Sequence, residues 1–345
     1  MAILNSSGAI VAKAKAKYGK RLKYDDYKRL LDCKTVAEVV SYLKTETSYK
    51  DVLVKVNENS VHRGQVEAIL RQKLLYDIDS LCRYDMSGGS RFSAFIVEGY
   101  EVEQIIHFLT LLSANRQKSV VLSVPTYFTN HCDIDFDALA KAQSFADFVD
   151  ALSTSPYGEI LRGYTPKSGE AINIPEIEDA LYTYVYKQLY EAINNTSSND
   201  KSELKRMFDN IINFQNFVRI LRMKKYYNEN PQFILKHLLP FGSISQKNLE
   251  AMCCAEDTDE VFGIMQSIPQ GKGLDRMRYN YPGEISKRAK FNISRNKLYY
   301  SSSPSVVLIS YVYLRQTELA NIINIIEGAR YSIEKSQVEQ LLIYK

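Results

Sequence analysis

Residues 27–43 read YKRLLDCKTVAEVVSYL, and this stretch recurs twice further along the chain. Residues 136–152 read FDALAKAQSFADFVDAL, and residues 249–265 read LEAMCCAEDTDEVFGIM. Apolar residues occupy matching places in the three copies: Val39, Phe148 and Val261; Val40, Val149 and Phe262; Leu43, Leu152 and Met265. An internal repeat governs the whole fold, so we predict that Leu43, Leu152 and Met265 are buried at equivalent places.

The period of the repeat indicates the size of the folding unit. The copies start about 110 residues apart, whereas the units of ordinary solenoid proteins span roughly 20 to 50 residues. A unit of this size can contain three or four helices and a core of its own. We therefore predict an all-α protein with three helical repeat domains, at residues 1–120, 121–242 and 243–345.

Further segments repeat with a similar period. Val66–Leu70 matches Ile177–Leu181, and a later segment matches in all three copies, at Gln104–Leu109, Asn216–Leu221 and Asn321–Ile326. Each copy is thus predicted to contain a pair of short helices, a middle helix and a long late helix.

The long helices can be placed from their periodicity and their terminal residues. Apolar residues at every fourth position from Ile177 to Ile193, after Pro175, predict one amphipathic helix. Asp200 with Glu203 resembles a capping box, which predicts the start of a helix that runs to about residue 227, before Pro231.

Two more long helices complete the pattern. One is predicted at about 92–114, after the polar break at 86–90, and another from Ser303–Pro304 to Gly328. The run at 119–124 is the one β-branched segment, and we interpret it as a connection between the first two copies.

Composition and charge exclude several classes of protein. Apolar residues make up 45% and charged residues 24% of the 345 residues, which is ordinary for a folded globular chain. The net charge of +4 is too small to indicate a nucleic-acid partner by itself, although Ala12–Lys23 is locally basic. No secretory signal is apparent, and five irregularly spaced cysteines indicate reduced thiols. The longest apolar run, Val306–Leu314, has half the length of a membrane span.

The sequence contains no recognisable catalytic, cofactor-binding or metal-binding motif. The glycines around Lys272 lack the spacing and the hydroxyl residue of a phosphate-binding loop. His131, Cys132 and Asp133 are adjacent, but a zinc site needs about four ligands at usable spacing, and no further ligand lies nearby. We therefore expect no enzyme activity, no cofactor and no metal.

Basic side chains are the candidates for binding a partner. Arg219, Arg222 and Lys225 lie near the end of the long helix in the second copy, where positive charge also complements the helix C-terminus. Lys13 and Lys15 lie in the N-terminal basic block. We predict that these five residues contribute to partner binding.

Two groups of residues together resemble a known family. Ala12–Ala16, Lys20–Leu22 and Asp26–Leu31 resemble the opening of the C/d subunit of V-type (A/V-type) rotary ATPases, with lysines in place of that family's arginines. Glu318–Ile323 and the residues up to Gly328 resemble its Glu-ϕ-x-Asn-ϕ pattern near the end. The resemblance, including length and threefold layout, extends over essentially the whole chain.

The resemblance implies a funnel-shaped protein made of three similar helical bundles around a pseudo-threefold axis. Such proteins have no catalytic site and lie peripherally on the cytoplasmic face of the membrane-embedded proteolipid ring, without a transmembrane segment. They receive the D and F subunits of the central stalk and transmit torque for ATP-driven proton or sodium transport. The alternative is a helical scaffold or a nucleic-acid-binding protein that uses the Lys13–Lys23 block, and its binding would weaken steeply with salt.

Overall fold

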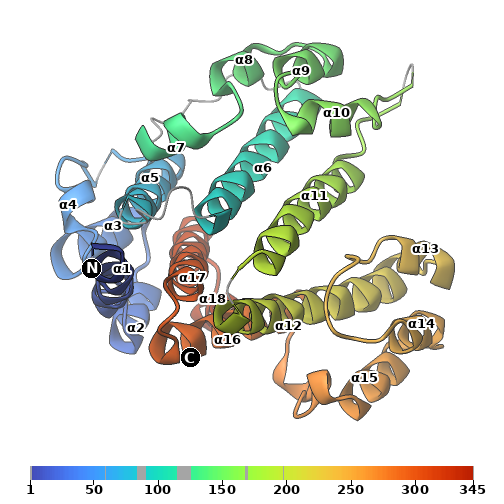
Figure 1. Ribbon diagram of the computed structural model, residues 1–345. Helices are drawn as coiled ribbons and strands as arrows, with labels where there is room; N and C mark the ends of the chain where they lie inside the picture. Colours follow the sequence, from blue (N-terminus) through green and yellow to red (C-terminus); the bar gives the residue numbers. More distant parts are fainter. Residues whose placement is uncertain are drawn as a thin grey trace. The chain divides into compact units, whose positions relative to one another are not determined.

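The computed structural model describes residues 2–58, 60–83, 91–114, 126–167, 170–196 and 198–344. Within these ranges every regular element is helical, so the prediction of an all-α fold is confirmed (Figure 1). The predicted connection at 119–124 and the polar break at 86–90 lie outside the described residues.

The chain divides into two compact units. A central unit contains Leu75–Ser197 with Met1–Ser6, and a terminal unit combines Ser7–Leu74 with Ser198–Lys345. The terminal unit is therefore built from both ends of the chain. The division into three domains, at 1–120, 121–242 and 243–345, stays a prediction.

The central unit is built on two long helices, α6 (Arg91–Ser113) and α11 (Ile174–Asn194), which pack along each other. Short helices connect them, namely α7 (Thr126–His131), α8 (Phe136–Lys141), α9 (Phe145–Ala151) and α10 (Pro156–Arg162). The second half of α5 (Arg63–Cys82) also belongs to this unit. Both long helices lie where the sequence predicts them. The residues spaced by four from Ile177 to Ile193 form the buried face of α11.

The terminal unit begins with most of α1 (Ala2–Gly19), followed by α2 (Tyr24–Asp32), α3 (Val36–Glu46), α4 (Lys50–Leu53) and the first half of α5. Its C-terminal part contains α12 (Ser198–Arg222), α13 (Pro231–Lys236), α14 (Gln246–Cys254), α15 (Thr258–Ser267), α16 (Pro282–Tyr300), α17 (Pro304–Arg330) and α18 (Lys335–Leu341). The long helix α16 packs along both α12 and α17. A π-helical turn at Met223–Tyr227 extends α12 to the predicted end.

The repeated sequence forms three helical hairpins, α2–α3, α8–α9 and α14–α15. The second helix of each hairpin begins after an aligned capping residue, Thr35, Ser144 or Asp257, whose side chain accepts a backbone N–H of the first turn. The predicted burial is confirmed, because the aligned Leu43, Leu152 and Met265 are each 0% exposed.

Two predicted helix ends are wrong in detail. Helix α12 begins at Ser198, before the predicted Asp200, and Glu203 is used elsewhere: its carboxylate accepts Lys297 Nζ at 2.8 Å and Ser301 Oγ at 3.0 Å. Helix α17 continues past Gly328 to Arg330. A Cβ at Gly328 would lie 2.5 Å from a methyl group of Val338, so this glycine permits close packing of α18 against α17 rather than ending the helix.

Candidate functional site

Three long helices carry a pair of polar residues one turn apart, and the first residue of each pair binds the chain that lies next to a helical hairpin. The pairs are Glu101 and Gln104 on α6, Asn213 and Asn216 on α12, and Glu318 and Asn321 on α17. We call each pair and its hairpin a junction. Five of these six side chains are buried, so their contacts are internal to the fold.

The second residue of two pairs binds a backbone segment outside the helices through both groups of its amide. Asn216 donates to Leu239 O and accepts from Leu239 N, each at 2.9 Å. Asn321 donates to Ile343 O at 2.8 Å and accepts from Ile343 N at 3.0 Å. A buried backbone segment outside a helix needs such partners for its N–H and C=O groups. The two asparagines therefore supply what a neighbouring strand would supply in a sheet.

The first residue of each pair binds the chain just before the hairpin. Asn213 Oδ1 accepts Ser243 N at 2.9 Å. Glu318 accepts Leu22 N at 3.1 Å, and Glu101 accepts the backbone N–H of Asp133.

The two glutamates each accept a second bond, from a tyrosine that follows the hairpin. Tyr49 donates its hydroxyl to Glu318 at 2.8 Å, and Tyr157 donates its hydroxyl to Glu101 at 2.7 Å. The same arrangement therefore occurs twice. At the third junction an amide replaces the carboxylate, and the second bond to Asn213 Oδ1 comes from Ile244 N at 3.2 Å.

Two of the long helices bind the next hairpin along the chain, and the third binds the first hairpin. Helix α6 binds α8–α9, α12 binds α14–α15, and α17 binds α2–α3 from the opposite end of the chain. The apolar cores agree: Phe217 and Leu221 of α12 pack with Val261 and Met265, and Ile322 and Ile326 of α17 pack with residues of α2 and α3. The hairpin of one sequence copy therefore packs against the long helix of another copy, not against the long helix of its own copy. The aligned Asn216 and Asn321 were a visible sign of the junctions, but their backbone partners carry no side-chain signal.

The five predicted partner-binding residues fall into two separate places in the terminal unit. Lys15 Nζ donates to the carbonyl oxygens of Tyr299 and Ser301, both at 3.2 Å, at the C-terminus of α16. Ser301 also contacts Glu203, near the start of α12. Arg219 is 16 residues further along α12, which corresponds to roughly 24 Å along a helix axis. The structure does not bring the two groups together.

The predicted residues also differ in how their side chains are used. Arg219 is half-buried, and its guanidinium donates to His237 O at 2.7 Å. Lys13 is half-buried on α1. Arg222 and Lys225 are exposed, and Lys225 Nζ lies 5.4 Å from the ring centroid of Tyr226.

Two exposed tyrosines follow the last two of these cations in the chain, and an exposed phenylalanine lies on α13, next to the carbonyl group that Arg219 binds; sequence reasoning missed all three. Tyr226 is 56% exposed, Tyr227 64% and Phe233 38%. With exposed Arg222, Lys225 and Lys236 they form a surface that we call the α12 tip. Aromatic residues and arginine are enriched in protein interfaces. The two tyrosines directly after Lys224 and Lys225 in the sequence were the signal that could have indicated the α12 tip.

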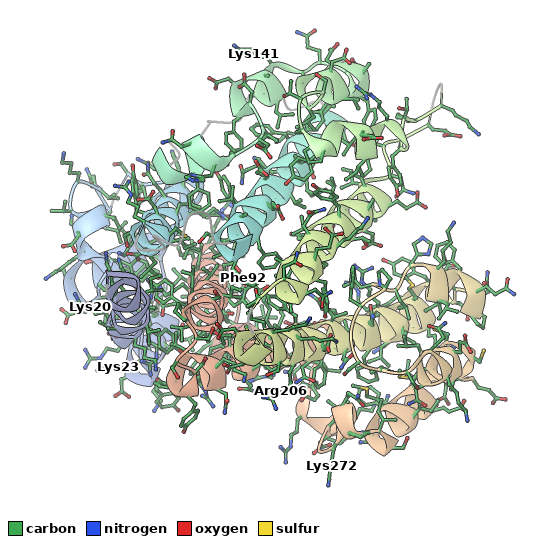
Figure 2. All side chains as sticks on the ribbon, viewed as in Figure 1. Lys20, Lys23, Phe92, Lys141, Arg206 and Lys272 are labelled. Carbon is green, nitrogen blue, oxygen red and sulfur yellow. The ribbon has the colours of Figure 1, made fainter. Side chains whose placement is uncertain are left out.

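A second exposed basic area lies where α1 leads into α2. Lys20 and Lys23 lie on this connection, and both are exposed (Figure 2). Arg21 is half-buried, with its guanidinium carbon 4.5 Å from the ring centroid of Tyr18. Part of the N-terminal basic block is therefore packed against the fold, and part of it faces solvent.

The part of the chain that the structure describes contains no group of three or more His, Cys, Asp and Glu arranged to hold a metal ion. Cys132 and Asp133 belong instead to the α6 junction. Burial, and then the nearby Glu101 and Asp133 carboxylates, raise the pKa of the Cys132 thiol well above its usual range. Among the described helices, none combines the length and the hydropathy that crossing a bilayer requires.

Comparison with known proteins identifies the family. The family described as ATP synthase (C/AC39) subunit matches residues 10–341, which is nearly the full chain. The chain belongs to this family. The resemblance seen in the sequence is confirmed.

Several archaeal proteins, each named as the C subunit of an A-type ATP synthase, are similar to the chain. The protein of Archaeoglobus fulgidus is 24% identical over 97% of this chain and 95% of its own length. The protein of Methanosphaera stadtmanae is 24% identical over 96% of this chain and 86% of its own. The protein of Pyrococcus furiosus is 32% identical, but that match covers only 35% of this chain and 31% of the relative. A match to the protein of Pyrococcus abyssi, at 26% identity, covers about half of each chain.

Proposed function

We propose that the chain is a non-catalytic rotor subunit of a rotary ATPase, which joins the D and F subunits of the central stalk to the membrane proteolipid ring. In this role it transmits torque for ATP-driven proton or sodium transport. It lies on the cytoplasmic face of the membrane, attached through the ring. The observation that carries the proposal is the match of the C/AC39 family to residues 10–341.

The junctions support the architecture that this role implies. Three long helices each bind one hairpin through a polar residue at the same place, Glu101, Asn213 or Glu318. Such recurrence is what three similar bundles around a pseudo-threefold axis would produce. A collar with this pseudo-symmetry is a suitable adaptor between a ring of many identical subunits and a single asymmetric shaft.

The α12 tip is the surface that we assign to one of these partners. Arg222 and Lys225 are exposed there among tyrosines, whereas Arg219 and Lys15 already bind carbonyl oxygens within the fold. Charged, hydrated contacts steer association and let a complex separate again. We therefore place the partner contact first on Arg222 and Lys225, with Arg219 one turn before them on the same helix, and we assign Lys13 and Lys15 on α1 to a separate contact.

The test is reconstitution of the double variant Arg222→Glu/Lys225→Glu with a purified D/F stalk and a purified proteolipid ring. Binding to one of the two partners should weaken by about tenfold or more at low salt, and the difference should shrink as salt rises. The circular dichroism spectrum should not change, because both side chains are exposed.

A matched control reverses two other exposed lysines, Lys141→Glu/Lys272→Glu, which lie on α8 and after α15 (Figure 2). This control changes the net charge equally and should leave binding unchanged. If both double variants bind both partners like the parent chain, the α12 tip is not the contact. If the parent chain binds neither partner but shifts nucleic acid in a gel, with steep salt dependence, the proposed function is wrong and the nucleic-acid alternative stands.

A further inference from the structure

The three junctions differ in the charge of the residue that lies one turn before the pair. This residue is Glu98 on α6, Asn210 on α12 and Arg315 on α17. Residues three apart on a helix lie on the same face, so each of these side chains is a neighbour of the first residue of its pair. The same structural position therefore carries a negative, a neutral and a positive side chain.

At the α17 junction the positive side chain compensates the buried carboxylate. The guanidinium of Arg315 donates to Glu318 Oε1 at 2.6 Å, and both side chains are about 95% buried. At the α12 junction the bonding residue is the neutral amide of Asn213, so no charge is buried. Neither of these junctions has a second carboxylate one turn before the bonding residue.

At the α6 junction two carboxylates lie one turn apart. Glu101 is 1% exposed and Glu98 is half-buried. The groups that act on Glu98 are Glu101 of its own helix and Asp133 after α7. The hydroxyl groups of Tyr157 on α10 and Tyr184 on α11 are in turn affected by Glu98. Among the described residues none of these groups is a cation.

This environment favours the protonated form of Glu98. Burial, followed by the fields of Glu101 and Asp133, raises the pKa of Glu98 to about 7. Burial is also the main cause that raises the pKa of Glu101. When Glu98 is ionised, its charge repels the carboxylate that accepts the Asp133 N–H and the Tyr157 hydroxyl.

We propose that the α6 junction is a proton-responsive contact, in which neutral Glu98 lets Glu101 bind the α8–α10 segment and ionised Glu98 weakens that binding. Opening of the segment separates Asp133 and Tyr157 from α6 and exposes both glutamates to water. The pKa of Glu98 in the opened form then returns toward its ordinary value. Because the closed form binds the proton more tightly, closing is favoured at low pH and becomes less favourable as pH rises toward and through 7. The other two junctions have no carboxylate at the position of Glu98.

Amide hydrogen exchange of the full chain tests the proposal without changing the sequence. The protection of residues 133–162 is measured between pH 5.5 and 8.5, corrected for intrinsic exchange rates, and divided by the protection of residues 246–267 at the α12 junction. The ratio should fall by about tenfold or more across this range. Its upper bound is about 30-fold, because a shift in pKa from 4.5 to about 7 gives roughly 300-fold in total and about tenfold of this lies below pH 5.5. A ratio that does not change with pH overturns the proposal.

Two variants and one direct titration assign the effect. Glu98→Gln should keep the high protection at all pH values, whereas Glu103→Gln, an exposed carboxylate on the same helix, should respond like the parent chain. A Glu98→Gln chain that loses protection with pH as the parent does would overturn the assignment. If Glu98→Gln does not fold, the carboxyl carbon-13 titration of Glu98 in the parent chain decides: a midpoint near the ordinary value of about 4.3 overturns the proposal.

Discussion

Replacing Asn321 by alanine should release the C-terminal extended segment from α17. The amide is 2% exposed, and it bonds both backbone groups of Ile343, at 2.8 and 3.0 Å. Ile343 is itself 4% exposed, so its N–H and C=O would be left buried without a partner. Each such group costs about 1–3 kcal/mol. The free energy of unfolding should therefore fall by about 2–5 kcal/mol, and the contact between Asn321 Nδ2 and the Tyr27 hydroxyl is also lost.

Denaturant unfolding measures this loss. Because the chain has two compact units, circular dichroism should be combined with hydrogen exchange of residues 338–344, so that the terminal unit is followed separately. Asn324→Ala, a half-buried asparagine on the same helix, controls for the change in helix propensity. A difference between the two variants below about 0.5 kcal/mol would refute the reasoning that the amide supplies essential backbone partners.

Further substitutions test other details of the terminal unit. Gly328→Ala should lower the free energy of unfolding by about 1–3 kcal/mol, because the new methyl group collides with α18. Gly263→Ala has open space at its Cβ and should raise the free energy of unfolding by about 0.5–1 kcal/mol. The melting temperatures of the two variants should therefore move in opposite directions. Ser332→Gly should raise the melting temperature, since Ser332 follows α17 with a φ of 51° that glycine adopts freely; an unchanged or lower temperature would contradict this. Arg315→Met should lower stability by about 3–5 kcal/mol in urea melts, because the buried Glu318 carboxylate loses its compensating charge, and the loss should shrink in the double variant with Glu318→Gln.

Local elements of the fold were predictable because their causes are local. The fourfold spacing from Ile177 to Ile193 and the proline at position 175 are sufficient to place α11. The capping residues Thr35, Ser144 and Asp257 lie at matching places in the repeat, so the hairpins recur with it. The start of α12 and the end of α17 differed from the prediction. At α17, Gly328 packs against Val338 of α18, and the helix continues past it.

The pairing of each hairpin with a long helix was not predictable in the same way. Leu221 and Ile326 show apolar faces, but an apolar face does not indicate which hairpin will cover it. The binding site of Asn321 consists of the backbone of Ile343, which any residue provides. Which hairpin packs against a given long helix therefore depends on contacts between distant parts of the chain.

The accessibility of the predicted partner-binding residues was only partly predictable. Near the end of α12, Arg222 and Lys225 are exposed and Arg219 is half-buried. Charge alone could not distinguish them from Arg219 and Lys15, because long cationic side chains also bind the carbonyl oxygens at helix ends within the same fold. The partner-binding assignment of all five residues stays a prediction until the reconstitution is done.

The α17 junction has a consequence for how the terminal unit forms. Glu318 binds Leu22 across a sequence separation of 296 residues and Tyr49 across 269. The core around α2 and α3 includes Ile322 and Ile326 of α17, so this hairpin cannot complete its core until the end of the chain is present. Contacts of such separation carry a large loop-closure entropy, which slows folding. The central unit is contiguous apart from six residues, so it can form earlier. We therefore expect the contact of α17 with the α2–α3 hairpin to form after the central unit, and the buried pair of Arg315 and Glu318 lies at this contact.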